Sequence, residues 1–314
     1  MKFRIRTVFL FTALLLFITT MNIQAQNRPS EQKTGSVLVF PYYTSNDDSS
    51  ANTLMNISNF GTTSVIAHLY FLEGVSCTQQ DTSVYLTPNA TLTLDAAFDV
   101  PLETGYLIVV AVDQAGCVIQ NGGLSGSAFV KAPAGYFGAG SGETRGNYGA
   151  LAFNAYTPIC PAGGEITLNF NGTTLDAMPT GVGVSVQNPN VAPGQTIVLA
   201  GLNGSISDGN VIGGAQVGTG AAYSANEVFR SFSAFILGTC QGITTITNST
   251  PRIAGFGTSG LSGLIAPGTA GILKFNTAGG AGLLITPRNN AGWSGLRQLT
   301  YTRTSNVTLK VPVF

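Results

Sequence analysis

The sequence predicts an all-β protein in which two antiparallel β-sandwich regions, each immunoglobulin-like, stand in tandem after a cleaved signal peptide. Short runs rich in β-branched and aromatic residues recur about every ten residues along the chain. The breaks between these runs are rich in Gly, Asn, Asp, Ser and Pro, which favour turns. The first seven runs show no helical period, and this combination is typical of strands folded back and forth into a sandwich.

Residues 36–130 are predicted to form the first sandwich domain, preceded by a flexible polar arm at 26–35. The breaks within this domain, such as SNDDSS and PLETG, consist of residues that tolerate turns. The expected strands are SVLVFPYY (36–43), NTLMNISNF (52–60), TSVIAHLYFL (63–72), TSVYLTP (82–88), ATLTLDAAF (90–98), GYLIVVAVD (105–113) and a weaker run at 118–130. The number and spacing of these runs are the basis of the immunoglobulin-like assignment.

Residues 131–164 mark a change in composition, because Gly and Ala are frequent there and aliphatic residues are few. We expect this segment to cross between the two β regions. One short helix is expected within it, near 147–156.

Residues 165–314 are predicted to form the second sandwich domain. The expected strands are EITLNF (165–170), GVGVSVQ (181–187), QTIVLAGL (195–202), EVFRSFSAFILG (227–238), GITTIT (242–247), AGILKF (270–275), GLLITP (282–287), LRQLTYT (296–302) and VTLKVPV (307–313). Residues 203–222 are Gly-rich and are interpreted as a long loop. The run at 227–238 also suits a helix, but its sequence and surroundings favour a strand.

Residues 1–25 have the three parts of a secretory signal peptide. Three basic residues stand in the first six positions, residues 8–18 are apolar apart from one threonine, and Ala25 is a suitable small residue before a cleavage site. The alternative is a retained membrane anchor, for which the apolar run is short because a helical span needs ~20 residues. We therefore expect an exported protein, extracellular or on the cell surface, with the periplasm as another destination and no transmembrane segment in the mature chain.

The four cysteines, Cys77, Cys117, Cys160 and Cys240, are predicted to form disulfides, because an even number in an exported chain favours bridges over free thiols. Three pairings are possible. The spacing suggests one bridge within each region, Cys77–Cys117 and Cys160–Cys240. A metal site is the alternative, and it is disfavoured because the sequence contains no Cys-x-x-Cys and a single histidine.

Charged residues make up only 9% of the chain, and this composition excludes several classes of function. The chain has 14 basic and 14 acidic residues, and three of the basic ones lie in the signal peptide, so the remainder is slightly acidic. A protein that binds nucleic acid or an anionic membrane through a basic face is therefore not expected. The sequence also lacks a phosphate-binding glycine loop, a dinucleotide fingerprint and a nucleophile elbow, and we predict no cofactor, no metal and no catalytic residues.

A secreted hydrolase is nevertheless kept as the second alternative function. Asp95 with Asp99, or Glu73 with Asp113, would supply the two carboxylates that glycoside hydrolysis needs. The single histidine, His68, lies inside an apolar run. It is interpreted as a structural residue, because a catalytic histidine needs a nucleophile and an orienting acid beside it.

Three aromatic residues in polar surroundings are candidate ligand contacts. Tyr42 and Tyr43 precede the SNDDSS loop, and Trp293 stands in Asn-Asn-Ala-Gly-Trp-Ser. A flat ring flanked by Asn and Asp suits a sugar, because the ring face takes the C–H surface and the polar groups take the hydroxyls. Packing of these rings in a core is nevertheless the favoured interpretation. If they are exposed, they support a carbohydrate-binding or adhesive module, with surface glycans as partners.

Six stretches of the sequence together resemble a group of uncharacterised exported bacterial β-rich proteins with no assigned activity. They are GSVLVFPYYTS (35–45), NISN (56–59), LTPN (86–89), TGYLIVVAVD (104–113) with the following Gly116-Cys117, and the C-terminal pair IAPGTAG (265–271) and LKVPVF (309–314). This resemblance implies export and a β architecture. It transfers no functional residue.

These observations favour a non-enzymatic structural protein of the extracellular space or the cell surface. Low charge and exposed strand edges favour association, so the expected partner is a second copy of the chain in a layer or fibre. The terminal strand at 305–314 and the arm at 26–35 are candidates for strand addition between copies. The arm is the poorer donor because it lacks alternating apolar residues, and the terminal strand is expected to pair within its own sheet.

Overall fold

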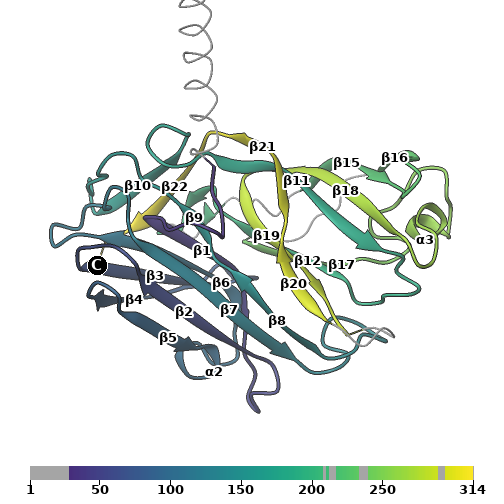
Figure 1. Cartoon of the computed structure of the whole chain (residues 1–314), viewed down its shortest axis with the longest axis horizontal. Coiled ribbons are helices and arrows are strands. Elements are labelled where there is room, and N and C mark those ends of the chain that lie inside the picture. Colours follow the sequence, from purple (N-terminus) through teal and green to yellow (C-terminus); the bar gives the residue numbers. More distant parts are fainter. Residues whose placement is uncertain (1–27, 208–209, 212–216, 233–239, 289–293, 314) are drawn as a thin grey trace, which may run out of the picture.

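The computed structural model describes residues 28–207, 210–211, 217–232, 240–288 and 294–313 (Figure 1). The predicted signal peptide at 1–25 and Trp293 lie outside these residues. Within them the chain is all-β, as predicted, with strands β1 to β22 arranged in five sheets and two short helices, α2 (Ala96–Asp99) and α3 (Gly260–Leu264). All pairings in the sheets are antiparallel except a short parallel one between β13 and β22.

The first region forms two facing sheets. The central sheet has the order β4 (Gln79–Leu86), β3 (Val65–Glu73), β6 (Thr104–Val112), β1 (Val37–Thr44) and β9 (Leu151–Phe153). The β2 sheet has the order β5 (Thr91–Asp95), β2 (Asn52–Asn59), β7 (Leu124–Ala132) and β8 (Thr144–Gly149). Between them lies a first core to which both contribute, for example Phe40 and Leu107 from the central sheet and Ile57 and Val130 from the β2 sheet. The two sheets therefore form a β-sandwich.

The second region contributes three further sheets. The β22 sheet has the order β10 (Glu165–Phe170), β22 (Val307–Pro312), β13 (Gly204–Ser205) and β14 (Asn210–Val211). The β18 sheet has the order β16 (Phe229–Phe232), β15 (Val217–Tyr223), β18 (Ala270–Thr277), β11 (Met178–Gln187) and β21 (Thr300–Ser305). The β12 sheet has the order β17 (Gln241–Thr245), β12 (Thr196–Gly201), β19 (Gly280–Thr286) and β20 (Gly295–Gln298).

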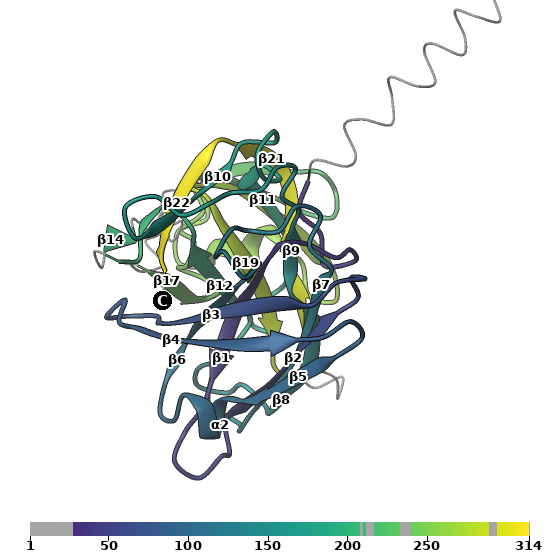
Figure 2. The ribbon, with the colours of Figure 1, turned by 90° about the vertical axis from the view of Figure 1, so that its left-hand side faces the viewer.

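Around β1 and β6 the central sheet is covered on both faces. Its second face packs against the β22 sheet (Figure 2). Val39 and Ile108 of the central sheet and Leu168 and Leu309 of the β22 sheet belong to this second core. All eight residues of β1 are consequently buried, and the run reads as continuously apolar in the sequence. In β18, by contrast, exposed and buried residues alternate, because only one face of its sheet meets the third core, shared with the β12 sheet.

The cores continue across the predicted domain boundary. Val198 of β12, Leu283 and Ile285 of β19 and Leu296 of β20 belong to the second region but pack in the first core. The edges of β8 and β20 are also bridged, because the Ser294 hydroxyl accepts from the Arg145 N–H and donates to the Arg145 carbonyl. The two regions thus pack as neighbouring layers around shared apolar cores.

The N-terminal segment expected to be a loose arm is docked over its described part. Ser30 pairs with Ala152 of β9, and Gly35 pairs with Leu124 at the start of β7. Lys33 reaches the buried carboxylate of Asp176. The local sequence is polar because backbone hydrogen bonds and an ion pair, not apolar side chains, hold this segment.

The prediction of a short helix near 147–156 is wrong, because strands β8 and β9 occupy this part of the chain. Leu151 and Phe153 enter the second core while Ala152 between them enters the first. Such alternation between two covered faces requires the two-residue period of a strand.

The Gly-rich stretch at 203–222 is not a loop throughout, because it contains β13, β14 and most of β15. Gly220 shows the reason for the small residues. A Cβ at this position would come within 2.0 Å of the Phe232 ring on the neighbouring strand β16. Glycine here permits close packing of a strand, which composition alone does not distinguish from a turn. The described part of the run at 227–238 is strand β16, as favoured.

Candidate functional site

All four cysteines form disulfides, as predicted, but the suggested pairing is wrong. The bridges are Cys77–Cys240 and Cys117–Cys160, with Cα–Cα distances of 5.6 and 4.0 Å. Cys117 lies beside Cys160 because the next residue, Val118, pairs with Ile159. Cysteines form a disulfide with the cysteine that is nearest in the folded structure, and their spacing along the chain did not predict which one that is. The two bridges suggest an oxidising environment.

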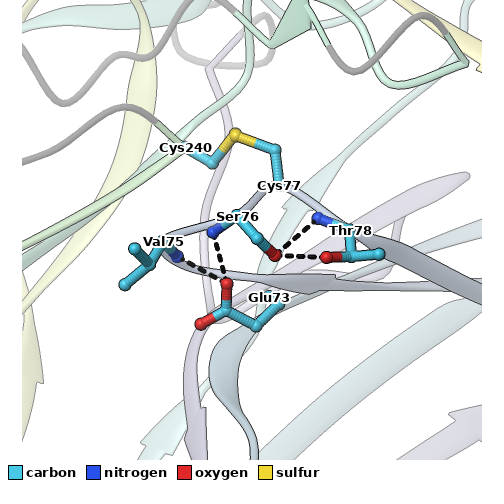
Figure 3. Close-up of a disulfide and its surroundings, with 6 residues drawn as sticks. All are labelled: Glu73, Val75, Ser76, Cys77, Thr78 and Cys240. Atoms are coloured by element: carbon cyan, nitrogen blue, oxygen red, sulfur yellow. Dashed lines mark hydrogen bonds between the residues drawn. A yellow bond between two sulfur atoms is a disulfide. The ribbon is translucent and has the colours of Figure 1, made fainter.

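The Cys77–Cys240 bridge lies at a junction between the two regions (Figure 3). Cys77 stands in the tight turn between β3 and β4, in the left-handed backbone region with φ of 62°. The Glu73 carboxylate closes this turn by accepting hydrogen bonds from the N–H groups of Val75, at 2.9 Å, and of Ser76. The turn is therefore shaped around the cysteine by its own polar groups.

Glu73 was a candidate catalytic acid, and its environment assigns it another task. Burial acts to raise the pKa of Glu73, but hydrogen bonds from Ser76 and the neighbouring N–H groups outweigh it, and the pKa is lowered. The carboxylate therefore stays ionised and fixed in the turn. A general acid needs a raised pKa and access to a substrate instead.

Gln241, next to the bridge, is the polar centre of the junction. Its backbone N–H donates to the Gly74 carbonyl at 3.0 Å. Its side-chain Nε2 donates to the carbonyls of Pro41, at 2.8 Å, and Gly105, at 2.7 Å. The register between β1 and β6 shifts between Phe40 and Tyr43, so this buried amide binds the backbone where the ladder is irregular. Sequence analysis missed Gln241, for which adjacency to a cysteine is the one available signal.

Tyr42 and Tyr43, two of the three candidate ligand contacts, are fully buried. The Tyr43 hydroxyl donates to the Glu103 carboxylate at 3.2 Å, and the Tyr42 ring packs 6.1 Å from the Phe137 ring. Burial raises the pKa of both phenols above the ordinary value. A ring must expose a face to stack on a sugar, so these two tyrosines are core residues and not sugar contacts. Nothing in the described residues concerns Trp293.

The remaining candidate carboxylates bind their own turns. Asp95 accepts from the Ala97 N–H at 3.1 Å and caps α2, and Asp99 accepts from the Asp95 N–H at 2.8 Å. Asp113 accepts from the N–H groups of Ala115 and Cys117, at 2.8 and 3.0 Å. Each carboxylate thus satisfies backbone donors beside it in the sequence.

His68 lies on β3 and is 4% exposed, in agreement with a structural position. Burial lowers its pKa, and the nearby Asp81 acts in the opposite direction. The unfolded chain therefore binds more protons than the folded one once the pH falls below about 6.5.

We expect the protein to lose stability as the pH falls from about 7.5 through 6.5 to the lowered pKa of His68, by at most about 1.4 kcal/mol per pH unit for one proton. Urea unfolding across this range measures the slope. His68→Gln should flatten this dependence of stability on pH. The stability of the same variant at pH 8, above the range of the titration, is the control for changes in packing. An unchanged slope in the variant would contradict the assignment.

Sequence analysis also missed Asp176, whose carboxylate is completely buried. It lies 2.5 Å from the Lys33 ammonium, 2.5 Å from the Asn154 N–H nitrogen and 2.5 Å from the Tyr156 hydroxyl. These contacts join the N-terminal segment, the end of β9 and the turn after β10. Nothing in the local pattern singles out this aspartate, because it stands in a short polar turn.

Among the described residues, no helix combines the length and apolar character needed to cross a membrane. No group of three or more His, Cys, Asp and Glu side chains in the same part of the chain is placed to hold a metal ion.

Comparisons with known proteins add little. No protein-family model matches the chain, and no curated protein matches it. Among solved structures, the crystal structure of Thermotoga maritima 1070 is similar at 12% sequence identity, covering 40% of this chain and 96% of that one with a TM-score of 0.28. At that score the similarity carries no argument.

Proposed function

We propose that the protein is a non-enzymatic structural protein exported to the cell surface or the extracellular space. The observation that carries the proposal is the Cys77–Cys240 bridge, which joins the β3–β4 turn to the residue just before β17 across a sequence separation of 163. With the shared cores, this bridge makes the two β regions one cross-linked body. Disulfides of this kind form and persist outside the reducing cytosol. The resemblance to exported bacterial β-rich proteins agrees with export.

The proposal includes the immunoglobulin-like character of the two regions. Two antiparallel sheets facing one another across one core, as the central and β2 sheets do, are what such a sandwich requires. It also includes the absence of catalysis. The support is that the candidate carboxylates cap turns and that His68 lies in a strand interior.

Self-association through a strand edge is part of the same proposal. The two segments first considered for strand addition are engaged within the chain: β22 pairs with β10 and β13, and the N-terminal segment is docked. Among the edge strands of the described chain β4 is the longest, with eight residues, and it is largely exposed. Such an edge presents unpaired backbone groups to a second copy of the chain.

Size-exclusion chromatography and negative-stain microscopy of the mature protein test this proposal. We expect assemblies that grow with concentration, and we expect Ser83→Lys with Tyr85→Lys on β4 to shift them toward monomer, because edge lysines block pairing. Phe98→Lys, which changes an 85% exposed side chain on α2, is the matched control and should leave assembly unchanged. A monomer at all concentrations would rule out self-association.

A further inference from the structure

The outer face of the β18 sheet carries two hollows that meet at Ala270. The larger has a volume of about 530 Å³, and the smaller about 180 Å³. The larger lies over the end of β15, the hairpin loop that follows it and the start of β18, and it includes Tyr223, Glu227 and Lys274. The smaller lies toward β11 and β20 and includes Ser185 and Arg297. Together they are called the β18 groove below.

A row of three side chains, Phe229, Tyr223 and Ile272, runs across the strands at this groove, and Tyr223 and Ile272 line the larger hollow. In register, Tyr223 of β15 lies opposite Phe229 of β16 on one side and opposite Ile272 of β18 on the other. The two aromatic rings have centroids 5.5 Å apart and a tilt of 46°. Phe229 and Ile272 are 52% and 44% exposed. The Phe229 ring is exposed and the Tyr223 ring is half-buried, and such rings on a sheet face offer a surface on which the C–H face of a sugar ring stacks.

Two cations flank the row. The Lys274 ammonium lies 5.2 Å from the centroid of the Tyr223 ring. The Arg297 guanidinium donates to the Ser185 carbonyl. Within the described residues neither cation is within ion-pair distance of a carboxylate. Burial lowers the pKa of Arg297, as expected for a partly desolvated cation without a counter-charge, and a bound anion would compensate it.

We propose that the β18 groove binds an acidic oligosaccharide, whose rings stack on Tyr223 and whose carboxylates meet Lys274 and Arg297. Neighbouring strands lie about 4.8 Å apart, so the four strands from β16 to β11 span about 15 Å, the length of a short oligosaccharide rather than one sugar. An acidic peptide fits less well. A peptide would bind by adding a strand to a sheet edge, but the strands under the groove are interior to their sheet. Each of β15, β18 and β11 has a neighbour on both sides, so an added strand would find few free backbone groups.

The sharpest probe is the trimer of galacturonic acid against its fully methyl-esterified form, which keeps the rings and removes the charge. Isothermal titration calorimetry of the mature protein should show about tenfold or greater preference for the acid, since a hydrogen bond to a charged group contributes about 1.5–3 kcal/mol. Lys274→Gln should weaken binding of the acid by about tenfold and leave the ester unchanged. Tyr223→Ala should weaken binding of both forms by a similar factor, because both stack on the ring.

Two residues outside both the groove and the β4 edge provide matched controls. Phe98→Ala on α2 removes an exposed ring, Lys131→Gln on β7 removes a half-buried lysine, and neither should change affinity. Thermal unfolding shows that each variant is folded. Equal affinity for acid and ester would overturn the acidic class of ligand. Failure of the wild type to bind either trimer, preference for an acidic peptide, or wild-type affinity in Lys274→Gln and Tyr223→Ala would overturn the site. None of these results bears on self-association through β4.

Discussion

Replacing Cys77 and Cys240 together by serine is expected to lower the free energy of unfolding by about 5 kcal/mol. The bridge closes a loop with a sequence separation of 163. In the chain-entropy model, a cross-link of this length removes most conformations that hold the two ends apart in the unfolded chain, and the gain grows with the logarithm of loop length. The variant keeps the Gln241 hydrogen bonds, so the junction is weakened rather than erased.

The second bridge supplies the comparison. Cys117→Ser with Cys160→Ser opens a loop with a sequence separation of 43, and the expected loss is about 4 kcal/mol. Denaturant unfolding of both double variants measures the difference, and peptide mapping without reduction identifies the bridged pairs. A larger loss from the Cys117–Cys160 variant would contradict the loop-length argument, and a Cys77–Cys117 peptide would contradict the junction itself.

Strands were predictable where the sequence pattern is local. The run at 165–170 is β10, because its alternation of buried and half-buried residues follows from one covered face. β1 was recognisable for the opposite reason, since both of its faces are covered and the run is continuously apolar. β15 was missed because Gly and Ala at its close-packed positions have the composition of a turn.

The site depends on contacts between residues that are far apart in the sequence. The pattern of neighbouring residues along the chain does not reveal such contacts. Tyr42 and Tyr43 precede a polar loop, so the sequence left ligand contact open beside the favoured core packing, and β1 carries both rings into the centre of the molecule. Tyr223 and Lys274 belong to strands that pair across 50 intervening positions, so their proximity is a product of register. The cysteine partners were missed for the same reason.

Replacing Asp176 by alanine is expected to lower the free energy of unfolding by about 3–5 kcal/mol. The change removes a completely buried carboxylate and leaves three donors behind: the Lys33 ammonium, the Asn154 N–H and the Tyr156 hydroxyl. Lys33 is 27% exposed at its side chain and so loses its partner while still partly desolvated. Each donor left without an acceptor adds its own cost of desolvation.

Two comparisons separate this effect from a general loss of charge. Glu143→Ala removes the partner of Arg288, where both side chains are about half exposed, and should cost less than about 1 kcal/mol. In a double-mutant cycle, Lys33→Met combined with Asp176→Ala should lose less stability than the sum of the two single variants. The reason is that the double variant leaves no ammonium without its partner. Limited proteolysis should cut the Asp176→Ala variant within residues 28–35 before the core, since that ion pair and two backbone pairings hold the segment. If Asp176→Ala costs no more than Glu143→Ala, or if cleavage at 28–35 is not accelerated, then the buried aspartate does not anchor the N-terminal segment and backbone pairing alone holds it.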